Sequence, residues 1–222
     1  MVTGRERPAY RTGRRGGTVR LRLGTRVRVA VAAQHLLAHL PPSPPDLAGV
    51  GDLTAGPRAE RLAARTLLRT LLAAELGRAA GTTPIAVHGS GQPYLPAWPR
   101  ITISLSHDAG TVAAAFGRGV PVGIDVQVPV PAPPALLRRC CTPAARAVLG
   151  DLPAPVRDHE FAWIWTVQEA CVKATGAGLA GRPWTIPVPV GRRAGMWNDL
   201  RWVSLRGHSR VPVSVAHGIG AR

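Results

Sequence analysis

The chain has 222 residues, enough for one large domain or two small ones, and 45% of them are hydrophobic, enough for a buried core. No segment reaches the roughly 18–20 consecutive apolar residues that a membrane-spanning helix needs, which argues against a membrane partner. The first residues carry arginines without the apolar stretch of a secretory signal, so we expect a cytoplasmic protein.

The net charge of +16 suits several anionic partners: nucleic acid, a phosphorylated cofactor or an acidic protein. Half of this charge lies within residues 1–30, which hold nine arginines and one acid, Glu6. Because residues 1–24 are rich in arginine and glycine, we expect them to form a disordered arm. A basic nucleic-acid-binding protein is therefore one alternative. No recognition module or interleaving of aromatic and basic residues supports a nucleic-acid partner.

The first half of the chain predicts strands and one long helix. Residues 25–33 alternate well enough for a strand. After a Pro/Gly loop, the segment from Arg58 to about Ala79 is the clearest helix, because its leucines form one apolar stripe. A turn-rich loop over residues 88–99 then leads to three strands, predicted at Ile101–His107, Thr111–Gly117 and Pro121–Val128.

The second half repeats this rhythm without repeating the sequence. A stiff proline-rich linker precedes a short helix over residues 134–141. A second short helix follows, with Thr142 as its N-cap, Pro143 at its first position and Gly150 as its stop. An aromatic-rich helix from His159 to about Thr175 precedes three strand candidates, at residues 183–190, 200–206 and 210–218.

Both halves therefore predict strands plus one long helix. This indicates an α/β (α+β) fold of two similar, pseudo-symmetric subdomains, each a small sheet packed on a long helix. We place the N-terminal subdomain at residues 25–120 and the C-terminal one at residues 121–222.

Asp125 is the unusual residue of an otherwise apolar strand. Side chains of a strand alternate between its faces, so Gly123, Asp125 and Gln127 point the same way. Two oxygen-bearing side chains on one face could form the edge of a site for a hard cation. A solvated strand face would give the same pattern.

Glu169 and Lys173 are spaced to lie on one side of a helix. They form either an exposed ion pair or part of a site. The helix around them is apolar over more than one stripe, which favours the border of a cleft. Lys173 is the only lysine among 28 basic residues, and lysine differs from arginine in being a compact charge that can donate a proton.

Ser106 and His107 end a predicted strand just before the tight connection "DAG". A histidine in such a position is most often packed or capping. Beside a serine at a strand end, it could also contact an anion.

Together these motifs resemble the Sfp-type 4'-phosphopantetheinyl transferase family. Its pattern is a G-K-P loop, a strand ending in S-H, then V-G-I-D-x-E and a helix with W-x-x-K-E-A/S-x-x-K-x-x-G-x-G. This chain has "GQP" at Gly91–Pro93, "SLSH" ending at His107, "VGIDVQ" at Val122–Gln127 and "WTVQEACVKATGAGL" at Trp165–Leu179. The motifs follow in the family's order with its spacing.

The resemblance implies coenzyme A in a cleft between two similar subdomains of a monomer. The group transferred would be 4'-phosphopantetheine, from coenzyme A to a serine of an apo acyl or peptidyl carrier protein, with release of 3',5'-ADP. Asp125, Gln127 and Glu169 would hold Mg²⁺ at the pyrophosphate. Glu169 would also act as the base, and Lys173 would steady the leaving group.

The resemblance also implies a set of residues that bind coenzyme A: Arg58, Arg65, Thr66, Gln92, Ser106, His107 and Lys173. Three glutamines depart from the family pattern. Gln92 and Gln168 stand where lysine is usual, and Gln127 stands where many members have an acid. A relative that binds coenzyme A without turnover is therefore a second alternative.

Overall fold

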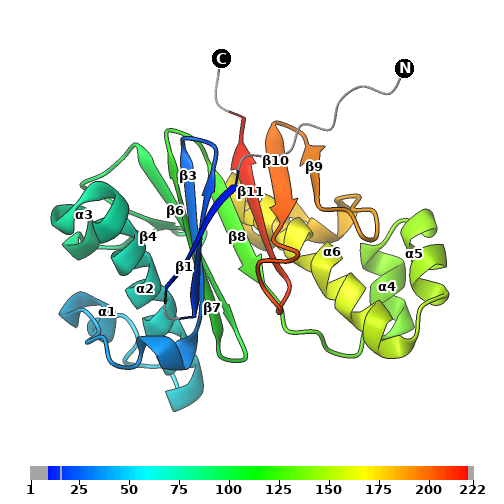
Figure 1. Cartoon of the computed structure of the whole chain (residues 1–222), viewed down its shortest axis with the longest axis horizontal. Helices are drawn as coiled ribbons and strands as arrows, with labels where there is room; N and C mark the ends of the chain where they lie inside the picture. The colour runs from blue at the N-terminus through cyan, green and yellow to red at the C-terminus, as the bar shows by residue number, and fades with distance from the viewer. Residues whose placement is uncertain (1–9, 16, 220–222) are drawn as a thin grey trace.

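A computed structural model describes residues 10–15 and 17–219 of the chain, and it combines two antiparallel sheets with helices on their outer sides (Figure 1). In the described residues the first sheet has the strand order β1-β2-β3-β7-β6-β5-β4, and the second has the order β8-β11-β10-β9. The predicted mixed α/β class, with a long helix packed on each sheet, is confirmed.

The first sheet is built from the N-terminal half. Its strands are β1 (Tyr10–Arg15), β2 (Thr18–Leu23), β3 (Val27–Ala33), β4 (Ala86–Val87), β5 (Pro93–Tyr94), β6 (Ile101–Asp108) and β7 (Thr111–Arg118). The long helix α2 (Ala55–Leu76) packs on it. Three short helices accompany α2: the 3-10 helix η1 (Gln34–Leu37), α1 (Pro44–Ala48) and α3 (Arg78–Thr82).

The second sheet is built from the C-terminal half. Its strands are β8 (Val122–Val126), β9 (Ala194–Trp197), β10 (Leu200–Ser204) and β11 (Val213–Gly218). The long helix α6 (Ala154–Thr175) packs on it. The remaining helices are α4 (Pro134–Cys140), α5 (Pro143–Gly150) and the 3-10 helices η2 (Gly178–Gly181) and η3 (Pro183–Thr185). None of the helices described is long and apolar enough to cross a membrane.

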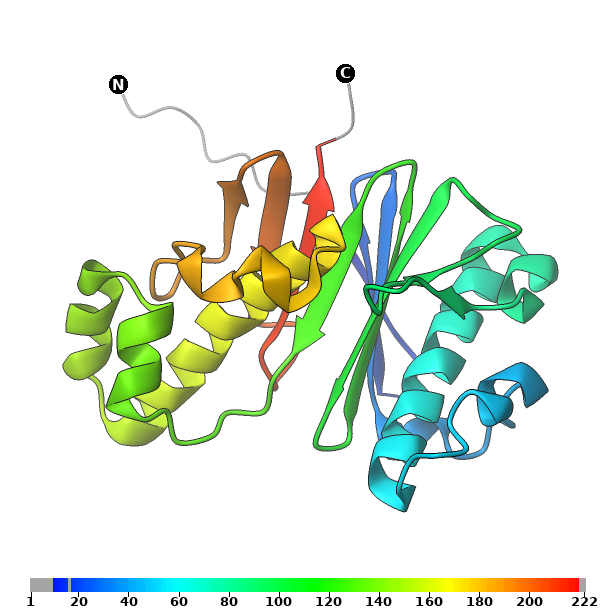
Figure 2. The ribbon, with the colours of Figure 1, turned by 180° about the vertical axis from the view of Figure 1, so that it is seen from behind.

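Three apolar cores hold the layers together. Figure 2 shows from behind that α2 and α6 lie on the two outer sides, with the sheets between them. One core lies between α2 and the first sheet, one between the two sheets, and one between α6 and the second sheet. Typical members are Leu67 and Phe116 in the first, Val29 and Ile124 in the second, and Val167 and Trp202 in the third.

The N-terminal segment differs from the expected disordered arm. Thr18–Leu23 forms β2, which pairs with β3, and Tyr10–Arg15 pairs with β2 as β1. In β2 Leu21 and Leu23 are buried, whereas Arg20 and Arg22, which alternate with them, are exposed. The alternation of a half-buried strand therefore outweighs the glycine and arginine content. Residues 1–9 and 16 of the predicted arm lie outside the described residues.

Residues 183–190 were expected to form a strand, and that prediction is wrong. Pro183, Pro187 and Pro189 lack the backbone N–H that a strand must donate. The segment instead forms η3 and a loop that buries Ile186 and Val188 against α6.

The two sheets meet along β6 and β8 through side chains. Every second residue of β6 is polar. Each of these side chains forms a hydrogen bond with the backbone of β8 or of a residue close to its ends. Ser104 Oγ accepts the Ile124 N–H at 3.0 Å, and Ser106 Oγ accepts the Val126 N–H at 3.2 Å. At the two ends, Thr102 Oγ1 donates to the Val120 carbonyl, and Asp108 Oδ2 accepts the Val128 N–H. We call Thr102, Ser104, Ser106 and Asp108 with these partners the β6–β8 seam. It holds the two halves in a defined register.

Candidate functional site

A cavity of about 540 Å³ opens beside the β6–β8 seam, and both halves of the chain line it. Arg61 and Arg65 of α2 form one side. Glu169 and Lys173 of α6 form another, and Asp125 of β8 lies between them and the seam. The cavity therefore joins a basic wall from the N-terminal half to a wall of mixed charge from the C-terminal half.

α6 approaches β8 closely enough to bring its charged residues to Asp125. Gly123 permits this approach, because a Cβ at that position would overlap the Ala170 carbonyl oxygen and the Ala174 nitrogen. Gly123 and Asp125 share one face of β8, as the alternation predicts, while Val122 and Ile124 face the core between the sheets. Any side chain at position 123 would push α6 away from the cavity.

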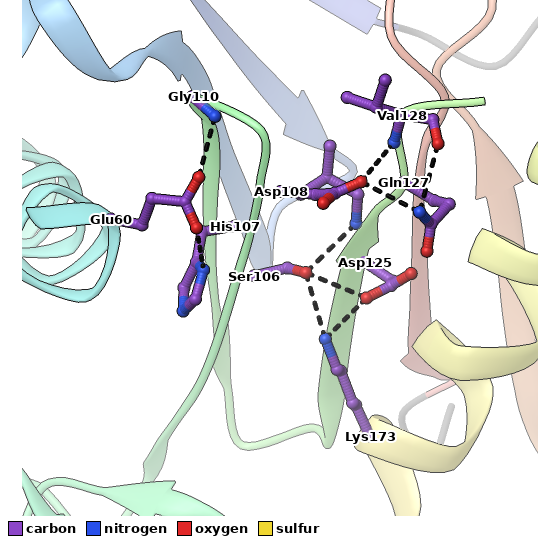
Figure 3. A network of polar contacts seen from close by, with 10 residues as sticks. Glu60, Ser106, His107, Asp108, Gly110, Asp125, Gln127, Val128 and Lys173 are labelled. Carbon is purple, nitrogen blue, oxygen red and sulfur yellow. Dashed lines mark hydrogen bonds and ion pairs between the residues drawn. The ribbon is translucent and has the colours of Figure 1, made fainter. Parts of the chain in front are cut away.

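Asp125, Ser106 and Lys173 form one polar network (Figure 3). Lys173 Nζ donates to Asp125 Oδ1 at 2.6 Å and to Ser106 Oγ at 3.2 Å. Ser106 Oγ donates its own proton to Asp125 Oδ1 at 2.9 Å and also accepts the Val126 N–H. A hydroxyl has one proton and two acceptor positions, and Ser106 uses all three here. Ser106 therefore positions Asp125 and Lys173. It also lines the cavity, and its predicted contact with coenzyme A stays a prediction.

Two carboxyl groups of the cavity, those of Asp125 and Glu169, have pKa values above the ordinary ones. Burial raises the pKa of Asp125, against the opposing pull of the Lys173 ammonium and the Ser106 hydroxyl. Burial also raises the pKa of Glu169, helped by the negative charge of Asp125 and opposed by Lys173. Glu169 is thus a half-buried carboxylate with raised proton affinity, which suits a group that accepts a proton during a reaction.

The oxygen donors of the cavity fit a hard cation. Asp125 and Glu169 each offer a carboxylate. Gln127 Nε2 donates to Asp108 Oδ2 at 2.9 Å and to the Val128 carbonyl at 3.1 Å, which leaves the Gln127 amide oxygen out of both bonds (Figure 3). The described residues hold no cluster of three or more His, Cys, Asp or Glu suited to a metal. Mg²⁺ commonly uses only one or two carboxylates together with water and substrate phosphates, so this donor set fits it.

His107 lies at the α2 side of the cavity and is held by Glu60 (Figure 3). His107 Nδ1 lies 3.1 Å from Glu60 Oε2, and Glu60 Oε1 accepts the Gly110 N–H at 2.9 Å. Glu60 was not among the residues predicted for the site. The only available signal was an acid among the arginines of the predicted helix.

Arg65, a predicted coenzyme A contact, lines the cavity, and a buried acid holds it in place. Arg65 Nη1 donates to Asp46 Oδ1 at 2.9 Å, while Arg69 donates to both oxygens of the same carboxylate at 2.6 and 3.0 Å. Burial opposes the ionisation of Asp46, but Arg69 and Arg65 together lower its pKa below the ordinary value. Asp46 lies in a proline-rich stretch, where nothing in the sequence indicated a partner for Arg65.

Three predicted coenzyme A contacts lie elsewhere. Arg58 is exposed near the start of α2 and is not among the described residues that line the cavity. Thr66 is buried and borders a separate apolar cavity of about 420 Å³ next to η1. Gln92 borders a smaller cavity of about 190 Å³, which shares Lys173 with the main one.

Gln168 points into the core, away from the cavity. Its side chain is fully buried, and Nε2 donates to the Cys140 carbonyl at 2.7 Å and to the Ile186 carbonyl at 2.8 Å. It thus ties the end of α4 and the segment after η3 to α6. A lysine at this position would have to leave the core to reach the cavity. With the present backbone, glutamine in place of lysine at position 168 therefore takes no positive charge out of the cavity.

We expect Gln168→Met to lower the free energy of unfolding by about 2–4 kcal/mol, because two buried carbonyls would lose their donor. Urea unfolding followed by far-UV circular dichroism measures the loss. Gln34→Met in η1, at a half-buried position outside these contacts, is the control. Equal stability of the two variants would contradict the anchoring role of Gln168.

Comparison with known proteins shows which family the site region is similar to. Residues 121–213 match the family model described as the 4'-phosphopantetheinyl transferase superfamily. The 4'-phosphopantetheinyl transferase of Bacillus subtilis is 28% identical over 117 residues, which are 51% of this chain and 50% of that protein. HetI of Nostoc sp. is 30% identical over 123 residues, 53% and 52% of the two chains. PptA of Paxillus involutus is 28% identical over 143 residues, 53% and 54%. The match thus spans about half the length of each curated relative.

The family model covers β8, α6 and most of the second sheet. These elements supply Asp125, Glu169 and Lys173, whose motifs carry the resemblance seen in the sequence. Through residues 121–213, the chain is similar to the 4'-phosphopantetheinyl transferase superfamily.

Proposed function

We propose that the protein transfers the 4'-phosphopantetheine group of coenzyme A to a serine hydroxyl of an apo acyl or peptidyl carrier protein, releasing 3',5'-ADP. The observation that carries this proposal is the convergence of Asp125, Glu169 and Lys173 on one cavity between the two halves of the chain. The names of the curated relatives, all 4'-phosphopantetheinyl transferases, support the same reaction.

In this proposal the subdomains predicted at residues 25–120 and 121–222 belong to one monomer and hold coenzyme A between them, and the first also includes β1 and β2. The basic side of the cavity, with Arg61, Arg65 and His107, suits the phosphorylated nucleotide end. The side with Lys173 suits the pyrophosphate. This orientation places the reacting phosphorus beside Glu169.

The reaction moves one phosphoryl-linked group and one proton. The serine oxygen of the carrier bonds to the phosphorus that carries pantetheine, and the bond from that phosphorus to the bridging oxygen breaks. The electron pair of the broken bond leaves with 3',5'-ADP. Asp125, Gln127 and Glu169 would hold Mg²⁺, which when bound neutralises charge on the pyrophosphate.

The chain's own residues supply the remaining functions. Glu169 accepts the serine proton, directly or through water, and its raised pKa makes it a stronger base than an ordinary glutamate. Lys173 reaches the leaving phosphate from its position beside Asp125 and balances the charge that develops there. Ser106 orients both groups from β6.

The direct test is to incubate the protein with coenzyme A, Mg²⁺ and an apo carrier protein and to weigh the carrier by mass spectrometry. We expect a gain of one phosphopantetheine group. Several carriers from fatty-acid, polyketide and peptide synthesis should be tried. No gain with any of them would reject the transferase. Binding of coenzyme A in that case would favour the relative without turnover.

Ser104 and Ser106 provide a matched pair that separates structural support from catalysis. Each accepts one N–H of β8, so Ser104→Ala and Ser106→Ala should each lower the free energy of unfolding by about 1–3 kcal/mol. Only Ser106 also contacts Asp125 and Lys173. We therefore expect kcat to fall at least about tenfold in Ser106→Ala alone. Equal kcat values in the two variants, measured well below their unfolding temperatures, would contradict this role of Ser106.

A further inference from the structure

We infer that Glu60 makes phosphate binding at His107 proton-linked, so that the protein takes up a proton when it binds coenzyme A. This inference rests on the proposed function, because it assumes that a phosphate of coenzyme A lies against His107. Glu60 would act as a positioning residue that determines which form of His107 faces the ligand.

The geometry fixes which histidine nitrogen faces the cavity. Glu60 reaches from α2 to β6, where Oε2 lies 3.1 Å from His107 Nδ1. The second oxygen of Glu60 accepts the backbone N–H of Gly110, so the carboxylate is held at two points (Figure 3). Both side chains are partly buried, with 32% of His107 and 23% of Glu60 exposed. His107 therefore has Nδ1 engaged, and only Nε2 remains to meet a ligand.

The charge of the ligand then determines the proton count. A carboxylate accepts hydrogen bonds, so His107 must carry a proton on Nδ1. In the neutral ring the other nitrogen, Nε2, has a lone pair and no proton, and a lone pair repels a phosphate oxygen. Nε2 can donate to phosphate only after the ring gains a second proton from solvent. His107 thus takes up one proton when the phosphate binds, and the resulting imidazolium is stabilised between Glu60 and the phosphate.

Other charged groups face the same region. α2 contributes Arg61 and Arg65 beside Glu60, and β6 itself contributes Asp108. β8 contributes Asp125, α6 contributes Glu169 and Lys173, and His35 of η1 borders the neighbouring cavity next to Gly110. All of these groups remain in a Glu60→Gln variant. A difference in proton uptake between the two proteins therefore reports on the Glu60–His107 pair.

Glu60→Gln is the informative substitution because glutamine can keep both contacts. Its oxygen can accept the Gly110 N–H, while its NH₂ group donates to His107 Nδ1. The neutral ring would then carry its proton on Nε2 and could donate to phosphate with no proton taken from solvent. The variant should keep its fold and lose the proton linkage.

The experiment is isothermal titration of the full chain with coenzyme A in the presence of Mg²⁺. Titration at several pH values, in two buffers of different ionisation enthalpy, gives the number of protons taken up. For wild type we expect coenzyme A binding to take up protons, approaching about one per site, with the affinity falling as pH rises. For Glu60→Gln we expect uptake near zero. Ionisation of the ligand's own phosphate contributes equally to both proteins.

Two controls locate the effect. His107→Gln removes the titrating group while keeping a donor, and should behave like Glu60→Gln. Dephospho-coenzyme A, which lacks the 3'-phosphate, tests which phosphate lies at His107. Loss of uptake with this ligand would assign the 3'-phosphate, and uptake that persists would assign the pyrophosphate.

The outcomes separate this inference from the proposed function. Equal proton uptake by wild type, Glu60→Gln and His107→Gln, with normal coenzyme A binding, would overturn the inference and leave the transferase standing. If no protein bound coenzyme A at any pH, both would fall.

Discussion

Replacing Lys173 with arginine is expected to lower kcat for phosphopantetheine transfer about 100-fold or more, although the charge is kept. The ammonium of Lys173 lies between Asp125 Oδ1 at 2.6 Å and Ser106 Oγ at 3.2 Å, next to Glu169 in the cavity. The planar guanidinium is bulkier than an ammonium and cannot release a proton near neutral pH. The compact lysine ammonium can rotate from the Asp125 carboxylate toward the leaving phosphate. The rigid arginine guanidinium cannot make the same movement.

The matched control for Lys173→Arg is the reverse exchange at an exposed position, Arg138→Lys on α4. This control should have wild-type kcat. The rate is measured with saturating coenzyme A, using a carrier that the wild-type protein modifies. An arginine variant with full activity would show that only positive charge matters at position 173.

The charged residues that line the cavity were easier to predict from the sequence than the contacts that hold them in place. Asp125, Glu169 and Lys173 were found because each is a polar residue in an apolar setting, and short-range spacing places each on its face of a strand or helix. Glu60 and Asp46 were missed because their partners, His107 and Arg65, lie 47 and 19 residues away. No periodic pattern links residues so far apart, so only the fold can pair them.

The β6–β8 seam was predictable from the sequence only in part. The alternation of Thr102, Ser104, Ser106 and Asp108 is visible in the sequence and predicts a strand with one polar face. The same alternation is equally typical of a solvent-exposed face, such as the one that carries Arg20 and Arg22 in β2. What distinguishes them is β8, whose N–H groups need acceptors in a buried setting. That need appears only when the two halves are brought together.

Gln168 shows how a family comparison of residues can mislead. Its neighbour Glu169 faces the cavity, and the motif alone places both beside the phosphates. Adjacent positions on a helix point about 100° apart, and here that rotation carries Gln168 into the core. The loss of a family lysine at this position therefore says less about turnover than the sequence indicated.

Replacing Glu169 with glutamine is expected to have a second large effect, a fall in kcat of about 100-fold or more. The glutamine side chain keeps the shape of the glutamate but cannot accept the serine proton. It also removes one of the two carboxylates that are proposed to hold the cation. The assay is the same carrier modification, repeated over a range of Mg²⁺ concentrations. Activity restored fully by excess Mg²⁺ would assign Glu169 to cation binding alone and contradict its role as base.

The same variant should be more stable than wild type when divalent cations are removed by a chelator. Burial and the negative charge of Asp125 raise the pKa of Glu169 in the folded state. A carboxyl group with a raised folded pKa favours folding below its unfolded pKa, and this benefit is lost as pH rises through the folded value. At neutral pH the ionised Glu169 therefore opposes folding, and glutamine does not.

Thermal unfolding in chelator tests the sign of this effect. The Tm of Glu169→Gln should exceed that of wild type near neutral pH, and the difference should shrink as pH falls through the raised pKa of Glu169 toward that of the unfolded chain. A lower Tm for the variant at neutral pH would show that Lys173 stabilises the glutamate more than burial and Asp125 destabilise it. A rise in stability together with a loss of turnover would show that the carboxylate at position 169 serves the reaction although it lowers the stability of the folded state.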